Sequence, residues 1–119
     1  MVNHLSAADA AVGTAMAALA DPTRRAVVRM LALEPLPAGR IAAEFPISKP
    51  AMSRHLRVLR EAGLVEDGRD PGDARVRVYR LRPESVDAVA AEVEVIRSFW
   101  AGQLAAFKEF AESEEGRAQ

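Results

Sequence analysis

Apolar residues recur at intervals of three and four along most of the chain, the spacing that aligns side chains on one face of a helix. The first such segment covers residues 6–20 and is rich in alanine. A second helix begins at Asp21-Pro22, because aspartate caps helix N-termini and proline fits the first helical position. Pro35 and Pro37 end this helix, since proline cannot continue it. The opening of the chain is therefore expected to form two helices.

Two shorter helices are predicted between residues 37 and 62. One opens at Pro37 and ends at Pro46, and Ser48 stands where it can cap the next. The inner side of this next helix consists of Met52, His55, Leu56 and Leu59. Gly63 is placed for a left-handed turn at its end. Two helices joined by three or four residues, the second capped and basic, are typical of a helix-turn-helix.

A β-hairpin is predicted over about residues 64–82. Residues 64–67 form a short strand, residues 68–73 are rich in turn-forming residues, and residues 75–81 alternate between polar and apolar positions. A hairpin that directly follows a helix-turn-helix is a wing.

A long helix is predicted over residues 84–111, with a heptad-like apolar spacing of four and three. The residues in this seam are Val89, Val93, Ile96, Trp100, Gln103, Phe107 and Phe110. The fold class is therefore mainly α, with four helices, a wing and a fifth helix. We expect residues 1–112 to form a single domain and residues 113–119 to form a disordered polar tail.

The formal charge of −1 hides a strong segregation of charge along the chain. Residues 21–82 contain 13 lysines and arginines against 8 acidic residues, and residues 83–119 contain 3 against 8. A basic centre indicates contact with a polyanion such as double-stranded DNA. The chain has no cysteine, which excludes disulfides and thiolate metal sites. No apolar run is long enough to span a membrane, so we expect a cytoplasmic protein without membrane contact.

Three segments resemble the ArsR-type (ArsR/SmtB) winged helix-turn-helix repressors. Residues 19–25 (LADPTRR) are similar to the start of the family's second helix, residues 47–65 to its recognition helix and exit, and residues 76–81 to its second wing strand. The resemblance implies a dimeric bacterial or archaeal repressor that docks through its first and fifth helices. Autoregulation is also suggested by this resemblance.

The chain departs from the family pattern in three places. Residues 38–44 lack the Cys-x-Cys motif of the metal-sensing branch, and the fifth helix has no histidine for the second metal-sensing pattern. Pro46 replaces the usual turn glycine, so the turn must differ locally. We expect no metal site and no cofactor, and the residues indicate no particular effector. An acidic group at Asp87, Glu92 and Glu94 favours a solvated helix face over a metal site.

The outer face of the predicted recognition helix carries the candidate DNA contacts. Base edges are assigned to Lys49, Pro50, Ser53 and Arg54, because the N-terminal part of such a helix enters the major groove. Contacts to the DNA backbone, from this helix or the wing, are assigned to Ser48, Arg57, Arg60, Arg69, Arg75 and Arg77. The alternatives are a solvated basic face and, because Asp70 and Asp73 share the wing tip, an ion-paired hairpin.

Other candidate residues have two interpretations each. Arg24, Arg25 and Arg40 either contact phosphate or belong to a solvated surface. His55 is expected to pack on the inner side of its helix with one hydrogen bond, while a pH-sensing role is the lesser alternative. An apolar ligand around Met16, Phe99 and Trp100 is conceivable, but core packing is favoured.

The long apolar seam predicts a homodimer, because one small domain cannot easily cover it. The expected interface residues are Val12, Met16, Val89, Val93, Ile96, Trp100 and Phe107. The alternative is a stripe that folds over its own domain. A two-fold dimer places two recognition helices about 34 Å apart on a pseudo-palindromic site. We expect a transcriptional regulator and not an enzyme, because no catalytic motif is present. A winged helix for protein or RNA contact is the second hypothesis.

Overall fold

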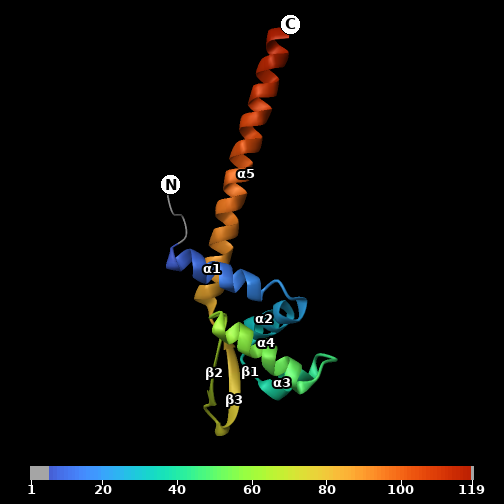
Figure 1. Cartoon of the computed structure of the whole chain (residues 1–119), viewed down its shortest axis with the longest axis vertical. Helices are drawn as coiled ribbons and strands as arrows, with labels where there is room; N and C mark the ends of the chain where they lie inside the picture. The colour runs from blue at the N-terminus through green and yellow to red at the C-terminus, as the bar shows by residue number, and fades with distance from the viewer. Residues whose placement is uncertain (1–5, 119) are drawn as a thin grey trace. The chain divides into compact units, whose positions relative to one another are not determined.

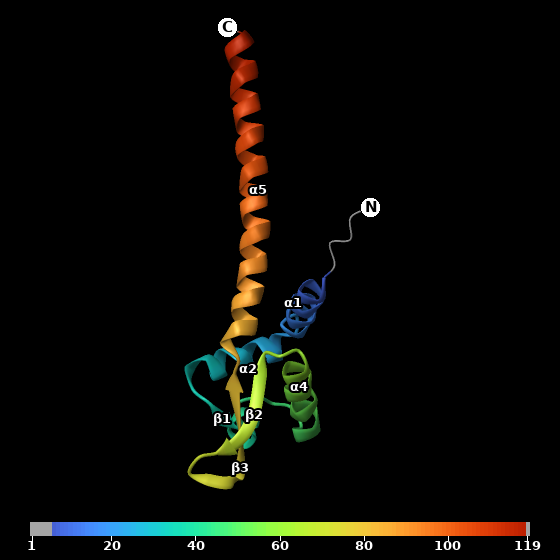
Figure 2. The same ribbon diagram turned by 90° about the vertical axis from the view of Figure 1, so that its left-hand side faces the viewer.

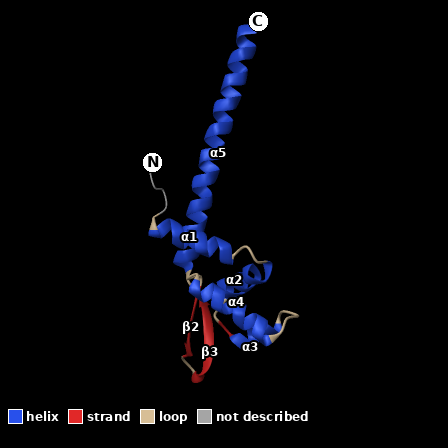
Figure 3. Cartoon of the chain, in the orientation of Figure 1, coloured by secondary structure: helices blue, strands red, loops and turns tan. Residues whose placement is uncertain are grey.

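The computed structural model describes residues 6–118, in which helices dominate and strands form one small sheet (Figures 1 and 3). The elements are α1 (Ala7–Ala18), α2 (Pro22–Leu33), β1 (Leu36–Pro37), α3 (Ala38–Ala43), α4 (Lys49–Glu61), β2 (Val65–Asp70), β3 (Asp73–Leu81) and α5 (Pro83–Ala118). This order confirms the predicted winged helix-turn-helix class.

The chain divides into two units, with the boundary between Val89 and Ala90. The sequence predicts one domain over residues 1–112, and the division differs because the buried core lies entirely within the first unit. The second unit is the continuation of α5. Its helix runs to Ala118, so the segment expected to be a disordered tail after residue 112 is helical. The residues from 113 onward include no proline that would stop a helix.

Local capping chemistry fixes the starts of the helices. Ser6 and Asp9 form a reciprocal capping box at α1, in which each side chain accepts a hydrogen bond from the other's backbone N–H. Asp21 caps α2 by accepting a hydrogen bond from the backbone N–H of Arg24 at 3.0 Å. Pro22 occupies the first turn as predicted. These caps satisfy backbone donors that a helix leaves unpaired at its N-terminus.

The end of α4 turns the chain into the wing. Gly63 has φ +75°, and its N–H donates to the carbonyl of Arg60 while Leu64 donates to that of Leu59. This pair of bonds is the Schellman arrangement, in which glycine adopts the left-handed conformation without a Cβ penalty. The predicted C-cap role of Gly63 is confirmed.

The sheet has three antiparallel strands in the order β1-β3-β2. The hairpin of β2 and β3 is longer than predicted, because β2 continues to Asp70 and only Pro71-Gly72 remains as the turn. The strand β1 was not predicted. Its two residues, Leu36 and Pro37, pair with Tyr79 and Val78, and so short a strand is defined by its partner and not by its own periodicity.

The core of the first unit joins all its helices to the inner face of the sheet. Its buried members are Ala15, Ala18, Val27, Leu31, Leu36, Ile41, Met52, Leu56, Leu59, Leu64, Val65 and Tyr79. Figure 2 shows α4 beside the hairpin, and the two elements are in contact. Met52, Leu56 and Leu59 bury one side of α4, which leaves its opposite side to solvent.

Candidate DNA-binding surface

The exposed side of α4 brings together the residues assigned to base contacts. Lys49, Pro50, Ser53 and Arg54 are all exposed, as is Arg57 one turn further along. Within residues 6–116, the side chains of Lys49, Arg54 and Arg57 have no hydrogen-bond or ion-pair partner, because no carboxylate lies within reach. We call Lys49, Pro50, Ser53, Arg54 and Arg57 the recognition face.

The N-terminus of α4 is capped from within the chain. Ser48 accepts a hydrogen bond from the backbone N–H of Ala51 at 3.2 Å, which confirms its predicted capping role. Its hydroxyl proton is still free to donate, and the positive end of the helix dipole lies beside it. Ser48 therefore combines a structural role with the chemistry needed to approach a phosphate.

Two arginines of the wing, unlike the cations of the recognition face, form ion pairs. Arg75 Nε and Nη2 donate to the two carboxylate oxygens of Asp73 at 3.1 and 3.2 Å. The Arg77 Nε lies 2.8 Å from Asp67 Oδ2. For these two arginines the structure has the ion-paired hairpin that sequence analysis left as an alternative to free cations. Arg69 is exposed and, among the described residues, has no ion-pair partner.

The acidic residues of the wing make different contacts. Asp70 closes the turn by accepting a hydrogen bond from the N–H of Gly72 at 3.1 Å. Asp73 also accepts from the backbone N–H of Arg75. The hydrogen bonds from Arg75 lower the pKa of Asp73 below its ordinary value. The side-chain bond is the larger cause, and the backbone bond is the second. Asp67 lies nearer the core and also approaches Arg60 of α4, with Arg60 Nη1 at 3.8 Å from Asp67 Oδ1.

Arg24 and Arg25 have a structural role that sequence analysis missed. Arg24 Nε donates to the carbonyl of Ala18 at 2.7 Å, and Arg25 Nη1 donates to the carbonyls of Leu19 and Ala20 at 2.9 Å. Together they satisfy the carbonyl of Ala18 at the end of α1 and those of the two residues that follow it, which the helix leaves without partners. The only sequence signal was two arginines shortly after a helix end.

His55 packs as predicted on the inner side of α4. Its side chain is half-buried, and its Nδ1 lies 3.2 Å from Arg24 Nη1. Because the guanidinium can only donate, the imidazole accepts at this nitrogen. The bond ties the middle of α4 to the start of α2.

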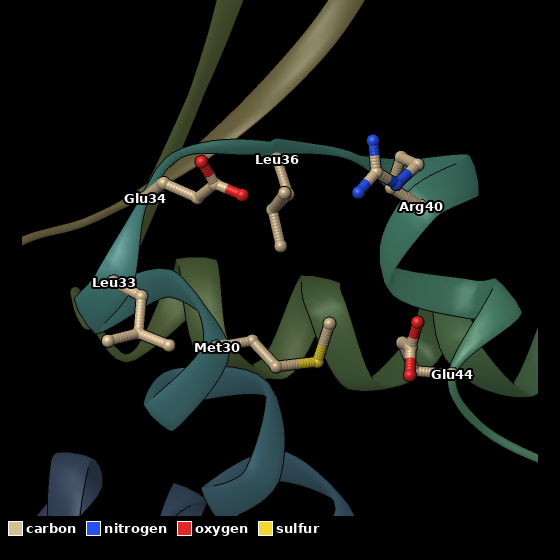
Figure 4. Close-up of a pocket in the computed structure, with 6 residues that line it drawn as sticks. All are labelled: Met30, Leu33, Glu34, Leu36, Arg40 and Glu44. Atoms are coloured by element: carbon tan, nitrogen blue, oxygen red, sulfur yellow. The ribbon is translucent and has the colours of Figure 1, made fainter.

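Arg40 lines a different pocket from the groove between α3 and the recognition helix. Ala38, Gly39 and Ala42 of α3 line a groove of about 230 Å³ against α4. Arg40 and Glu44, on the other side of α3, line a separate pocket of about 190 Å³ with residues from the end of α2 and β1. In Figure 4, Arg40 and Glu34 lie on opposite sides of Leu36 in this pocket. This placement favours the solvated-surface interpretation of Arg40.

The predicted interface residues lie in both units. In the first unit, Val12 is half-buried, Met16 is exposed, and Val89 packs against the core. In the second unit, α5 exposes a continuous set of large apolar side chains. These are Val93, Val95, Ile96, Phe99, Trp100, Leu104, Phe107 and Phe110. We call this set the α5 stripe; Trp100 alone is 65% exposed.

Two features are absent from the described residues. No helix in this part of the chain is both long and apolar enough to cross a membrane. Residues 6–118 also contain no group of three histidine, aspartate or glutamate side chains arranged to hold a metal ion, and Asp87, Glu92 and Glu94 do not form one.

Known proteins are similar to this chain in sequence and in fold. A helix-turn-helix domain family matches residues 19–67. The HTH-type transcriptional regulator Rv2034 of Mycobacterium tuberculosis is 42% identical over 97 residues, which cover 82% of this chain and 85% of the relative. The transcriptional repressor SdpR of Bacillus subtilis is 44% identical over 52 residues, 44% of this chain and 58% of the relative.

A solved structure extends the likeness to nearly the whole fold. An ArsR-like transcriptional regulator from Rhodococcus sp. RHA1 superposes with a TM-score of 0.72 at 31% identity, covering 86% of this chain and 93% of that one. Both the Rhodococcus protein and the Mycobacterium tuberculosis relative are described as transcriptional regulators. The chain therefore belongs to the ArsR family of winged helix-turn-helix proteins and is a DNA-binding transcriptional regulator.

Proposed function

We propose that this regulator is a homodimeric repressor that binds a pseudo-palindromic operator through the major groove. The observation that carries the proposal is the recognition face, where three cations are exposed and, among the described residues, unpaired on a helix with a capped N-terminus. Unpaired cations bind phosphate and base acceptors without first breaking an internal ion pair. The target is chromosomal DNA, so we propose that the protein acts in the cytoplasm.

Base readout is assigned to Lys49, Pro50, Ser53 and Arg54. Lys49 and Arg54 can donate to guanine N7 and O6, and the Pro50 ring can contact a thymine methyl. The remaining cations are assigned to the DNA backbone. They are Arg57 and Arg60 on α4 and Arg69, Arg75 and Arg77 on the wing, together with the hydroxyl of Ser48. Their contacts fix the register of the protein on the duplex.

The dimer is supported by the α5 stripe. Exposed apolar surfaces this extensive usually mark interfaces, and the heptad-like spacing favours a helix from a second copy. The proposed interface comprises Val12, Met16, Val89, Val93, Ile96, Trp100 and Phe107. Repression is supported by the printed description of the Bacillus subtilis relative as a repressor. Control of its own gene is a further part of the proposal.

Operator binding is tested with duplex DNA from immediately upstream of the gene for this protein. The purified protein is titrated against this fragment and a scrambled duplex at two salt concentrations. We expect tight, salt-sensitive binding to the upstream fragment alone, because phosphate contacts release counterions. Equal, weak binding to both duplexes at both salt concentrations would contradict autoregulation and favour a winged helix used for protein or RNA contact.

The dimer is tested separately by analytical ultracentrifugation. Ile96→Glu places a charge in the α5 stripe and is expected to yield monomers with an unchanged helical circular-dichroism spectrum. Ala105→Glu adds the same side chain on the opposite side of α5, away from the stripe, and should remain dimeric. Monomeric wild-type protein at high concentration would refute the dimer and leave the family assignment intact.

A further inference from the structure

The carboxylate of Asp67 lies between two arginines that come from two other elements. Arg77 of β3 approaches one carboxylate oxygen at 2.8 Å, and Arg60 of α4 approaches the other at 3.8 Å. The Asp67 side chain is 15% exposed, while those of Arg60 and Arg77 are 41% and 58% exposed. One largely covered carboxylate therefore joins the end of the recognition helix to the wing.

The register of the hairpin explains why an acid is needed at this position. Val65, Asp67 and Arg69 alternate along β2 and so lie on one face, where Val65 belongs to the buried core. Arg69 stands directly opposite Arg77 in the ladder, and like charges in that arrangement repel. Asp67 lies next to this pair on the same face and offsets one of its two charges.

The pairing leaves donors available on both arginines. A guanidinium has five N–H donors, and the contacts to Asp67 involve the Nε of Arg77 and one terminal nitrogen of Arg60. The remaining N–H groups of both side chains can still reach phosphate oxygens. The carboxylate restricts where each guanidinium can lie without occupying all of its donors.

We propose that Asp67 is a positioning residue for DNA recognition, which couples the wing to α4 by fixing Arg60 and Arg77 toward the phosphates of the operator. This inference rests on the proposed backbone contacts of those two arginines. Asp67 acts through the arginines and touches no DNA itself. Its effect is on discrimination between duplexes, because a misplaced guanidinium holds the DNA backbone in the wrong register for the recognition face. Removal of a guanidinium, as in Arg60→Ala, instead takes one backbone contact away from every duplex alike.

The test compares operator with scrambled duplex for Asp67→Asn and a matched control. The operator duplex is one selected from a random library by the wild-type protein. Asp67→Asn keeps the shape of the side chain and removes its charge. We expect the ratio of operator to scrambled affinity to fall roughly 2- to 10-fold, a size typical of coupled contacting residues. The scrambled duplex should be bound no more weakly than by wild type, because the protein gains positive charge.

The control is Asp73→Asn, which removes the same charge from the same hairpin. Among the residues that the structure describes, Asp73 pairs with Arg75 alone, two residues away, so it links no other element to the wing. We expect this variant to change the affinity for both duplexes by the same factor and to leave their ratio unchanged. Asp67→Glu, which retains the charge, should restore part of the lost ratio.

A double-mutant cycle separates positioning from general electrostatics. If Asp67 acts through its two partners, Asp67→Asn should have no further effect on the ratio in an Arg60→Ala, Arg77→Ala background. A wild-type ratio in Asp67→Asn, with both affinities shifted equally, would overturn the inference while leaving the operator proposal standing. If the wild-type protein selects no preferred duplex, the operator proposal itself fails, and this inference with it. Thermal unfolding of each variant confirms that it is folded.

Discussion

The recognition helix and the wing carry the same kind of cation in two different electrostatic states. On α4, Lys49, Arg54 and Arg57 are exposed and have no partner within the described part of the chain. On the wing, Arg75 and Arg77 are held by Asp73 and Asp67. In the sequence, all of these residues belong to one basic region. They differ in whether an internal ion pair must be broken before the cation can bind a phosphate.

The two regions also differ in what supports them. The inner side of α4 is held by Met52, Leu56 and Leu59, which are buried in the core. The outer part of the hairpin, beyond Asp67, is held by its ladder hydrogen bonds and by surface ion pairs. Burial of large apolar side chains stabilises far more than exposed ion pairs do. We therefore expect α4 to be a fixed platform and the wing tip to contribute through charge.

The largest expected effect is the loss of support under α4. Leu59→Ala removes a side chain that is completely buried and should lower the free energy of unfolding by about 2–5 kcal/mol. Leu33→Ala makes the same substitution at an 87% exposed position and should change stability by less than about 0.5 kcal/mol. Urea denaturation measures both. If a wing variant such as Arg75→Ala lowered the free energy of unfolding as much as Leu59→Ala, the expected difference in support between α4 and the wing would be wrong.

The second effect concerns base readout by the recognition face. Arg54→Ala should cost about 1–3 kcal/mol of binding free energy and relax the preference at one base position. Arg60→Ala, assigned to the backbone, should weaken binding to all duplexes alike. Fluorescence anisotropy with the operator and single-base variants distinguishes the two results. Equal losses on operator and random DNA for both substitutions would show that these roles are misassigned.

Much of this helix could be predicted because its signals are local. Ser48 and Gly63 are identified by the helix-end chemistry that each residue type supplies, and both occupy the predicted caps. The spacing of Met52, Leu56 and Leu59 fixes which side of α4 is buried. The recognition face follows from that side by elimination.

The missed features depend on contacts between distant parts of the chain. The ion pair of Asp67 with Arg77 requires the hairpin register, and its approach to Arg60 requires the packing of α4 on β2. The capping of α1 by Arg24 likewise depends on where α2 begins relative to the end of α1. No periodicity in the sequence encodes these distances.

A third, smaller effect distinguishes free cations from paired ones by their salt dependence. If Arg57 contacts a phosphate, Arg57→Ala should reduce the slope of log affinity against log salt by about 0.9. Arg75→Ala should reduce it by less, because the Asp73 carboxylate already neutralises that guanidinium. The slopes are obtained from titrations of one duplex over a salt series. Equal reductions would mean that DNA displaces Asp73 fully from Arg75.

The smallest effect is the pH dependence of the wing pair. Bonds from the Arg75 side chain and then its backbone N–H hold the pKa of Asp73 below its ordinary value of 3.8. A carboxyl with a lowered folded-state pKa stabilises the fold above its unfolded pKa, and this contribution is lost as pH falls through the folded value. The stability difference between wild type and Asp73→Asn should therefore be constant near neutral pH and shrink in acid below the ordinary value.

That difference should be small throughout, because Arg75 is 91% exposed and solvent screens the pair. Repeating the comparison in Arg75→Ala provides the control, since it removes the largest cause of the lowered pKa and leaves only the backbone bond. The acid-dependent part should then decrease. A difference that stayed constant down to the most acidic pH at which the protein folds would mean that the pair does not form in solution. Arg75 would then be as free as the cations of α4, and the electrostatic contrast between the two regions would rest on the pair of Arg77 with Asp67 alone.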